Sequence, residues 1–77
     1  MDKVQQTLQP IGFSYFGAIV RGDTLYETWT HDTSNFCLMI EDEGTFHLFD
    51  ERPKSTTLIA SFDSLQKFIA YFQAEFT

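Results

Sequence analysis

The sequence predicts a small α+β domain in which two helices cover one face of an antiparallel sheet. Two observations predict the class. Apolar residues recur at helical spacing near both ends of the chain, and the middle holds segments rich in aromatic and β-branched residues, separated by short polar turns. The expected order is a short helix, four or five strands and a second helix. We expect residues 1–77 to form one compact domain.

The C-terminal helix is the clearest element. Its apolar residues recur at intervals of three and four positions, and they are Phe62, Leu65, Phe68, Ile69, Phe72 and Phe76. This spacing predicts an amphipathic helix from about Asp63 to Phe76 whose apolar stripe faces the core. Asp63 is the expected N-cap, with Gln66 three residues later completing a capping box, and Ser61 is the alternative.

A shorter helix is expected at the N-terminus. Residues of helical spacing there are Met1, Val4, Leu8 and Ile11. Pro10 disfavours the helical conformation for Gln9, so the helix should end at that point. A helix of about two turns is unstable alone, and packing on the sheet must hold it.

Four strands are expected in the middle of the chain, at Phe13–Val20, Thr24–Thr30, Phe36–Glu41 and Thr45–Asp50, with a possible short fifth at Thr56–Ala60. Gly22-Asp23 suits a two-residue hairpin turn, and Asp42-Glu43-Gly44 suits a three-residue turn. The Arg21-Gly22-Asp23 tripeptide is explained by this hairpin and needs no receptor-binding role.

The turns set the register of the strands, because a slip of one residue moves every side chain to the opposite face. The expected pairs are Val20–Leu25, Phe16–Trp29, Trp29–Leu38, Leu38–Leu48 and Ile40–Phe46. The expected helix-covered face consists of Phe16, Val20, Leu25, Trp29, Phe36, Leu38, Ile40, Phe46 and Leu48. Glu27 would lie among these apolar residues, which is the weakest point of the assignment.

The same register predicts the composition of the second face, which no helix covers. That face should carry Tyr15, Ile19, Tyr26, Cys37, Met39, His47 and Phe49. This set is more apolar than a solvated face normally is, and it is the candidate interface for another protein or for a second copy of the chain. The alternative is that the polar segment 51–55 or curling of the sheet covers part of it.

The charge balance limits the classes of partner that the chain is expected to bind. Eleven acidic and five basic side chains give a net charge of −6, and the bases are scattered singly. Direct binding to nucleic acid is therefore disfavoured. Glu41, Asp42 and Glu43 form a candidate acidic docking surface, for a basic partner or as a mimic of nucleic acid. A solvated surface is the alternative.

The residues that carry chemistry are few. Cys37 is the only cysteine, so the chain forms no internal disulfide. His31 and His47 are expected on opposite faces, and no zinc-ligand spacing is present. Cys37, His47 and Asp50 have the residue types of a nucleophilic triad but lie mid-sheet, without expected oxyanion donors. We expect no metal, cofactor or catalytic site.

These observations predict a cytoplasmic, non-catalytic protein-interaction module, such as a regulator, adaptor or inhibitor. The start of the chain does not resemble a signal peptide, and no apolar stretch is long enough to cross a membrane. Two alternatives stay open. One is a small enzyme or ligand-binding domain that uses the His47 and Cys37 region, and the other is a structural subunit with no stable monomer.

Overall fold

The computed structural model describes residues 2–42 and 44–76, with the side chains of residues 3–42 and 44–75. Its elements are α1 (Asp2–Leu8), the 3-10 turn η1 (Gln9–Ile11), β1 (Phe13–Arg21), β2 (Thr24–His31), β3 (Phe36–Glu41), β4 (Thr45–Arg52), β5 (Ser55–Phe62) and α2 (Leu65–Phe76). The predicted α+β order is confirmed, and the fifth strand is longer than expected.

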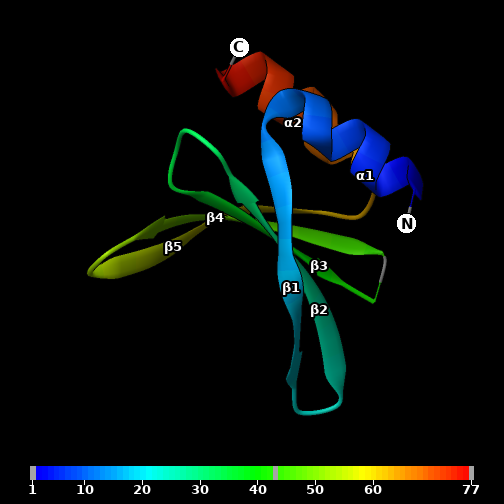
Figure 1. Cartoon of the computed structure of the whole chain (residues 1–77), viewed down its shortest axis with the longest axis vertical. Helices are drawn as coiled ribbons and strands as arrows, with labels where there is room; N and C mark the ends of the chain where they lie inside the picture. The colour runs from blue at the N-terminus through cyan, green and yellow to red at the C-terminus, as the bar shows by residue number, and fades with distance from the viewer. Residues whose placement is uncertain (1, 43, 77) are drawn as a thin grey trace.

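The five strands form one antiparallel meander in the order β1-β2-β3-β4-β5 (Figure 1). The predicted pairs Leu38–Leu48 and Ile40–Phe46 are confirmed, and so is Trp29 opposite Leu38. Each chain reversal between consecutive strands is short, so every strand pairs with its neighbour in sequence.

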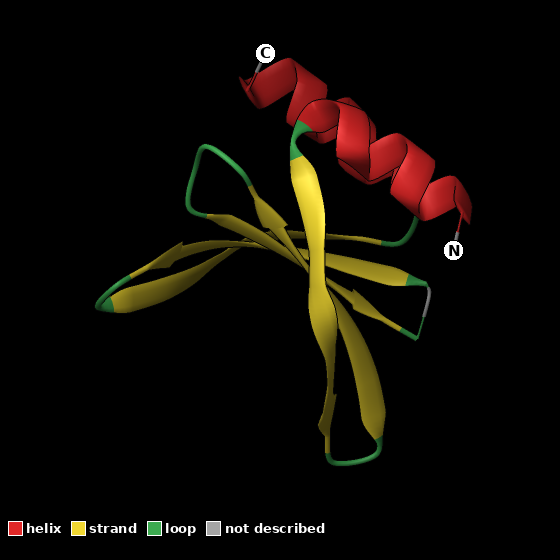
Figure 2. Cartoon of the chain, viewed as in Figure 1, coloured by secondary structure: helices red, strands yellow, loops and turns green. Residues whose placement is uncertain are grey.

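The two helices lie near one end of the sheet (Figure 2), and they are neighbours, because residues of both line one hollow. Phe68 and Phe72 of α2 pack edge-on against Phe13, and Leu8 of α1 joins the same cluster. The buried core consists of Leu8, Phe13, Trp29, Leu38, Ile40, Phe46, Leu48, Phe68 and Phe72. The β1–β2 and β4–β5 hairpins extend away from the helices (Figure 2).

A bulge in β1 changes the predicted register. Tyr15 pairs with Trp29 and Gly17 pairs with Thr28, which leaves Phe16 as the extra residue. Tyr15 therefore lies on the helix-covered face, with its ring 5.2 Å from that of Trp29. The expected places of Tyr15 and Phe16 were both wrong, because a bulge reverses the alternation on one side of it.

The far half of the β1–β2 hairpin also departs from the expected core. Val20 and Leu25 face each other as predicted, yet 68% and 48% of their surface is exposed. They lie on the part of the hairpin that extends beyond the helices. Glu27, in the same region, is partly buried and borders a hollow on this face together with Leu25, Ile40 and Asp42.

The start of α2 differs from both predicted caps. Ser64 Oγ accepts a hydrogen bond from the Lys67 backbone N–H at 3.2 Å, which makes Ser64 the N-cap. Asp63 instead forms an ion pair with the Lys67 ammonium at 2.9 Å. None of the described helices is long and apolar enough to cross a membrane.

Candidate interaction surface on the second sheet face

The second face of the sheet has a buried floor although neither helix covers it. Cys37 is 5% exposed and Thr28 is 8% exposed, and they lie on neighbouring strands. Met39 and Phe49 beside them are half-buried. Part of this face is therefore buried, and Glu51, from the polar segment expected to cover it, lies at the border of the same region.

A hollow of about 210 Å3 opens over this floor. We call it the central hollow, and it is lined by Phe16, Ile19, Arg21, Thr28, Thr30, Cys37, Met39 and Glu51. The bulge places Phe16 at its wall, with 73% of its surface exposed. Thr28 Oγ1 is the one buried side-chain polar atom without a hydrogen-bond partner among the described residues.

A second hollow of about 190 Å3 continues from the first. It is lined by Arg21, Tyr26, Met39, Glu41, His47 and Phe49. Arg21 and Met39 line both hollows, so the two form one surface. Six of the seven predicted interface residues line it. Tyr15, on the opposite face, is the exception.

A polar chain crosses this surface from β3 to β5. His47 Nε2 lies 2.9 Å from Glu41 Oε1, and His47 Nδ1 lies 2.8 Å from Ser61 Oγ. Ser61 was missed as a functional candidate because its place opposite His47 depends on a bulge at the β4–β5 pairing. In the sequence, Ser61 is marked only as the alternative N-cap of the C-terminal helix.

The predicted acidic docking surface is not assembled by its described members. Glu41 turns onto the second face, where it bonds to His47. Asp42 borders a different hollow, with Leu25, Glu27 and Ile40 on the helix side. β3 ends at Glu41, and Asp42 starts the turn with a positive φ of 48°, so these two neighbours do not share one surface. The third residue, Glu43, lies outside the described part of the chain.

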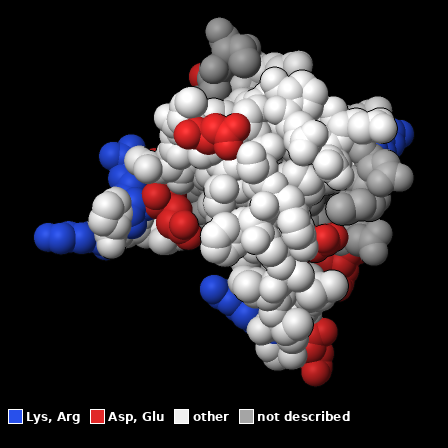
Figure 3. Space-filling model, in the orientation of Figure 1, with Lys and Arg blue, Asp and Glu red and all other residues white. Residues whose placement is uncertain are grey.

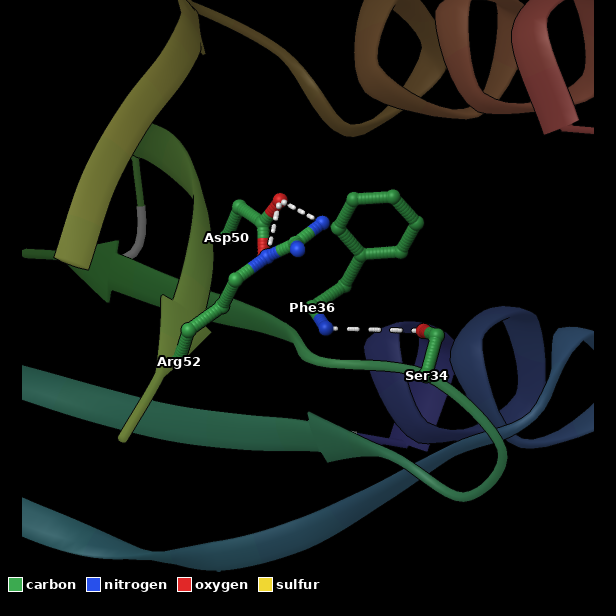
Figure 4. Close-up of polar contacts among 4 residues, drawn as sticks. All are labelled: Ser34, Phe36, Asp50 and Arg52. Atoms are coloured by element: carbon green, nitrogen blue, oxygen red, sulfur yellow. Dashed lines mark hydrogen bonds and ion pairs between the residues drawn. The ribbon is translucent and has the colours of Figure 1, made fainter. Parts of the chain in front are cut away.

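The Cys37–His47–Asp50 combination is not assembled either. Asp50 accepts hydrogen bonds from Arg52 at 3.2 Å (Figure 4), and it pairs with Phe36, on the face opposite to Cys37. Burial, with a smaller contribution from Glu51, raises the pKa of the Cys37 thiol to about 11. Such a thiol is a poor nucleophile at neutral pH.

His31 has a structural role on the other face. Its Nε2 lies 3.0 Å from the carbonyl oxygen of Ile11, and its Nδ1 lies 2.8 Å from Ser34 Oγ. The ring thereby joins the N-terminal segment to the β2–β3 loop. Its separation from His47 agrees with the prediction, and the described residues contain no group of three His, Cys, Asp or Glu suited to a metal ion.

Comparison with known proteins gives no further guide to this surface, since no family model, curated protein or solved structure matches the chain.

Proposed function

We propose that the chain is a non-catalytic protein-interaction module that binds a basic protein partner through the two hollows of the second sheet face. The observation that carries the proposal is the central hollow, an apolar depression with an unpartnered buried hydroxyl, on a face that neither helix covers. Exposed apolar surface of this kind is typical of interaction sites.

The lining residues favour a particular kind of contact. Ile19, Met39 and Phe16 supply apolar walls for the aliphatic part of a long side chain. Thr28 Oγ1 can accept a hydrogen bond from its polar end, and Glu51 supplies a negative charge nearby. An inserted lysine or arginine satisfies all three features, and Glu41 and Glu51 outnumber Arg21, the one arginine or lysine among the residues that line the two hollows.

The charge of the whole chain supports the same kind of partner. A net charge of −6 on 77 residues attracts a basic surface over distance and speeds its encounter. Charge outside the hollows thus steers association, and the apolar lining holds the complex. A cytoplasmic location is part of this proposal.

Photo-crosslinking in the cells that produce the protein tests the proposal. A benzophenone amino acid replaces Leu58, which is 53% exposed and pairs with Phe49 on the second face, or Leu25, which is 48% exposed on the helix side. We expect a basic protein to crosslink from position 58 and not from position 25. Once purified, that partner should bind the Met39→Glu variant more weakly than the wild-type chain. Its binding to the wild-type chain should also weaken as the salt concentration rises. Equal crosslinking from both positions would contradict the proposal.

The Ser61–His47–Glu41 chain favours a second candidate, a small hydrolase or ligand-binding protein. Its distances match the hydrogen bonds that join a nucleophile, a general base and an orienting carboxylate. A fluorophosphonate probe tests it directly. Labelling of Ser61 that disappears in His47→Gln would favour the enzyme, and an unlabelled folded protein would favour the interaction module.

A further inference from the structure

β1 is an edge strand with exposed apolar side chains on both faces of the sheet. Phe16 is 73% exposed on the second face, and Val20 is 68% exposed on the helix side. They are the two most exposed of the large hydrophobic residues described. A partner that docks on one face covers only one of them, whereas a strand added at the edge contacts both.

The edge has little protection against such pairing. Natural edge strands are commonly blocked by charges, prolines, bulges or short length. β1 is nine residues long, and Arg21 at its end is its only charged residue. No proline interrupts it, and its one blocking feature is the bulge at Phe16. The middle of the molecule, where β1 runs nearest the viewer in Figure 1, is uncharged (Figure 3).

We propose that two copies of the chain pair through their β1 strands, antiparallel about a two-fold axis, so that their sheets become one continuous sheet. An isologous interface of this kind closes on itself and gives a dimer. The pairing does not depend on the docking proposed for the second face.

The proposed register pairs the exposed apolar side chains of β1 with apolar side chains of the second copy. It sets Tyr15 opposite Val20 of the second copy, both on the helix side. It also sets Phe16 opposite Ile19 of the second copy, both on the second face. The symmetry repeats each pair, and the small residues Gly17 and Ala18 lie at the centre, where the two bulges approach. Aromatic–aliphatic pairs of this type stabilise antiparallel strands.

The charges favour the same orientation. Asp32 lies beside the start of β1, since its N–H donates to the Gly12 carbonyl at 2.8 Å and its carboxylate accepts from Ser14 Oγ at 2.9 Å. The antiparallel register sets Arg21 opposite Ser14 of the second copy, next to that carboxylate. A parallel arrangement would instead bring the two Arg21 side chains together.

Sedimentation equilibrium tests the dimer. We expect a mass twice the 8.9 kDa of one chain. Phe16→Glu and Val20→Glu should each give folded monomers, because both side chains are exposed and a charge disrupts the edge. Leu58→Glu, on the opposite edge strand β5, should stay dimeric. Circular dichroism verifies the fold of each variant.

Three results would overturn the proposal. A wild-type chain that is monomeric at about 1 mM, where even weak dimers form, excludes the pairing and leaves second-face docking untouched. Dissociation by Phe16→Glu but not by Val20→Glu assigns the dimer to the second face instead. Dissociation by Leu58→Glu assigns it to the other edge.

Charge reversal tests the register. Arg21→Asp or Asp32→Arg alone should weaken the dimer roughly tenfold or more, since each leaves like charges opposed. The double variant, which exchanges the two charges, should recover most of the lost affinity. Failure of the double variant to recover would contradict the antiparallel register.

Discussion

His47 Nε2 lies 2.9 Å from Glu41 Oε1, and this contact fixes the proton arrangement of the whole polar chain on the second face. A carboxylate only accepts hydrogen bonds, so Nε2 donates to it. In the neutral ring Nδ1 is then the acceptor, and the Ser61 hydroxyl donates to it at 2.8 Å. The His47 side chain of β4 thereby joins β3, through Glu41, to β5, through Ser61, beside the second hollow.

We expect this contact to stabilise the fold measurably. Both side chains are partly buried, with 21% and 35% of their surfaces exposed, so solvent screens the interaction incompletely. A double-mutant cycle with His47→Gln and Glu41→Gln should give a coupling of about 1 kcal/mol in urea unfolding. A coupling near zero would mean that the contact only orients the side chains.

Two phenylalanine truncations should separate the core from the surface. Phe68 is fully buried and packs against Phe13, Phe62 and Phe72. Phe68→Ala should destabilise the domain by about 3–5 kcal/mol, a large part of the stability of a chain this size. Phe16→Ala is the matched control and should change the unfolding free energy of the monomer by less than about 1 kcal/mol. Similar losses from both would contradict the assigned burial.

The sequence was sufficient for the parts of the fold that depend on periodicity and turn length. The stripe containing Phe68 and Phe72 predicted α2, and the two tight turns predicted the pairs Val20–Leu25 and Leu38–Leu48. Such features are local, because each follows from residues a few positions apart.

Long-range features were not predictable in the same way. The bulge at Phe16 lies beside Gly17, and a glycine inside a strand is a local signal of a bulge, but it does not tell whether the residue before or after it is the extra one. Ser61 became part of the candidate site through the second bulge, in the β4–β5 pairing. The extent of the helices over the sheet decided that Val20 is exposed, and periodicity carries no information on that extent.

Ser64 should contribute to the stability of α2. Its Oγ accepts the Lys67 N–H, which otherwise has no partner within the helix. Ser64→Ala should therefore cost about 1 kcal/mol in the free energy of unfolding. Asp63→Ala, which removes an exposed ion pair, should cost less. If Asp63→Ala cost more, Asp63 would be the cap, as the capping-box pattern predicts.

Gly12 should not tolerate a side chain. Its φ of 100° is unfavourable for other residues, and a Cβ there would lie 2.7 Å from His31 Nε2. Gly12→Ala should thus break the His31 contact with Ile11 and destabilise the domain by more than about 1 kcal/mol. Gly22→Ala has a positive φ of 63° but meets no neighbouring atom, so thermal unfolding should show a smaller loss. Equal losses would mean that backbone strain alone matters.

Cys37 should resist alkylation in the folded protein. Its pKa is raised from 9.0 to about 11, mainly by burial, which lowers the thiolate fraction at pH 8 about 100-fold. Limited access should slow the reaction further. Iodoacetamide labelling followed by mass spectrometry should be slow for the native chain and fast in urea. Rapid labelling of the native chain would contradict the buried placement of Cys37.

The same shift makes the stability of the fold depend on pH in the alkaline range. The folded state holds the thiol proton more tightly than the unfolded state, so the contribution is fully present below pH 9 and declines as pH rises toward about 11. Cys37→Ala lacks this group and is the reference. Urea unfolding measures the free energy of unfolding of the wild type and of Cys37→Ala. Between pH 8 and pH 11 the value for the wild type should fall, relative to that for Cys37→Ala, by up to roughly 2–3 kcal/mol. Other titrating groups cancel in that difference, and a difference independent of pH would show that the thiol ionises equally well in both states.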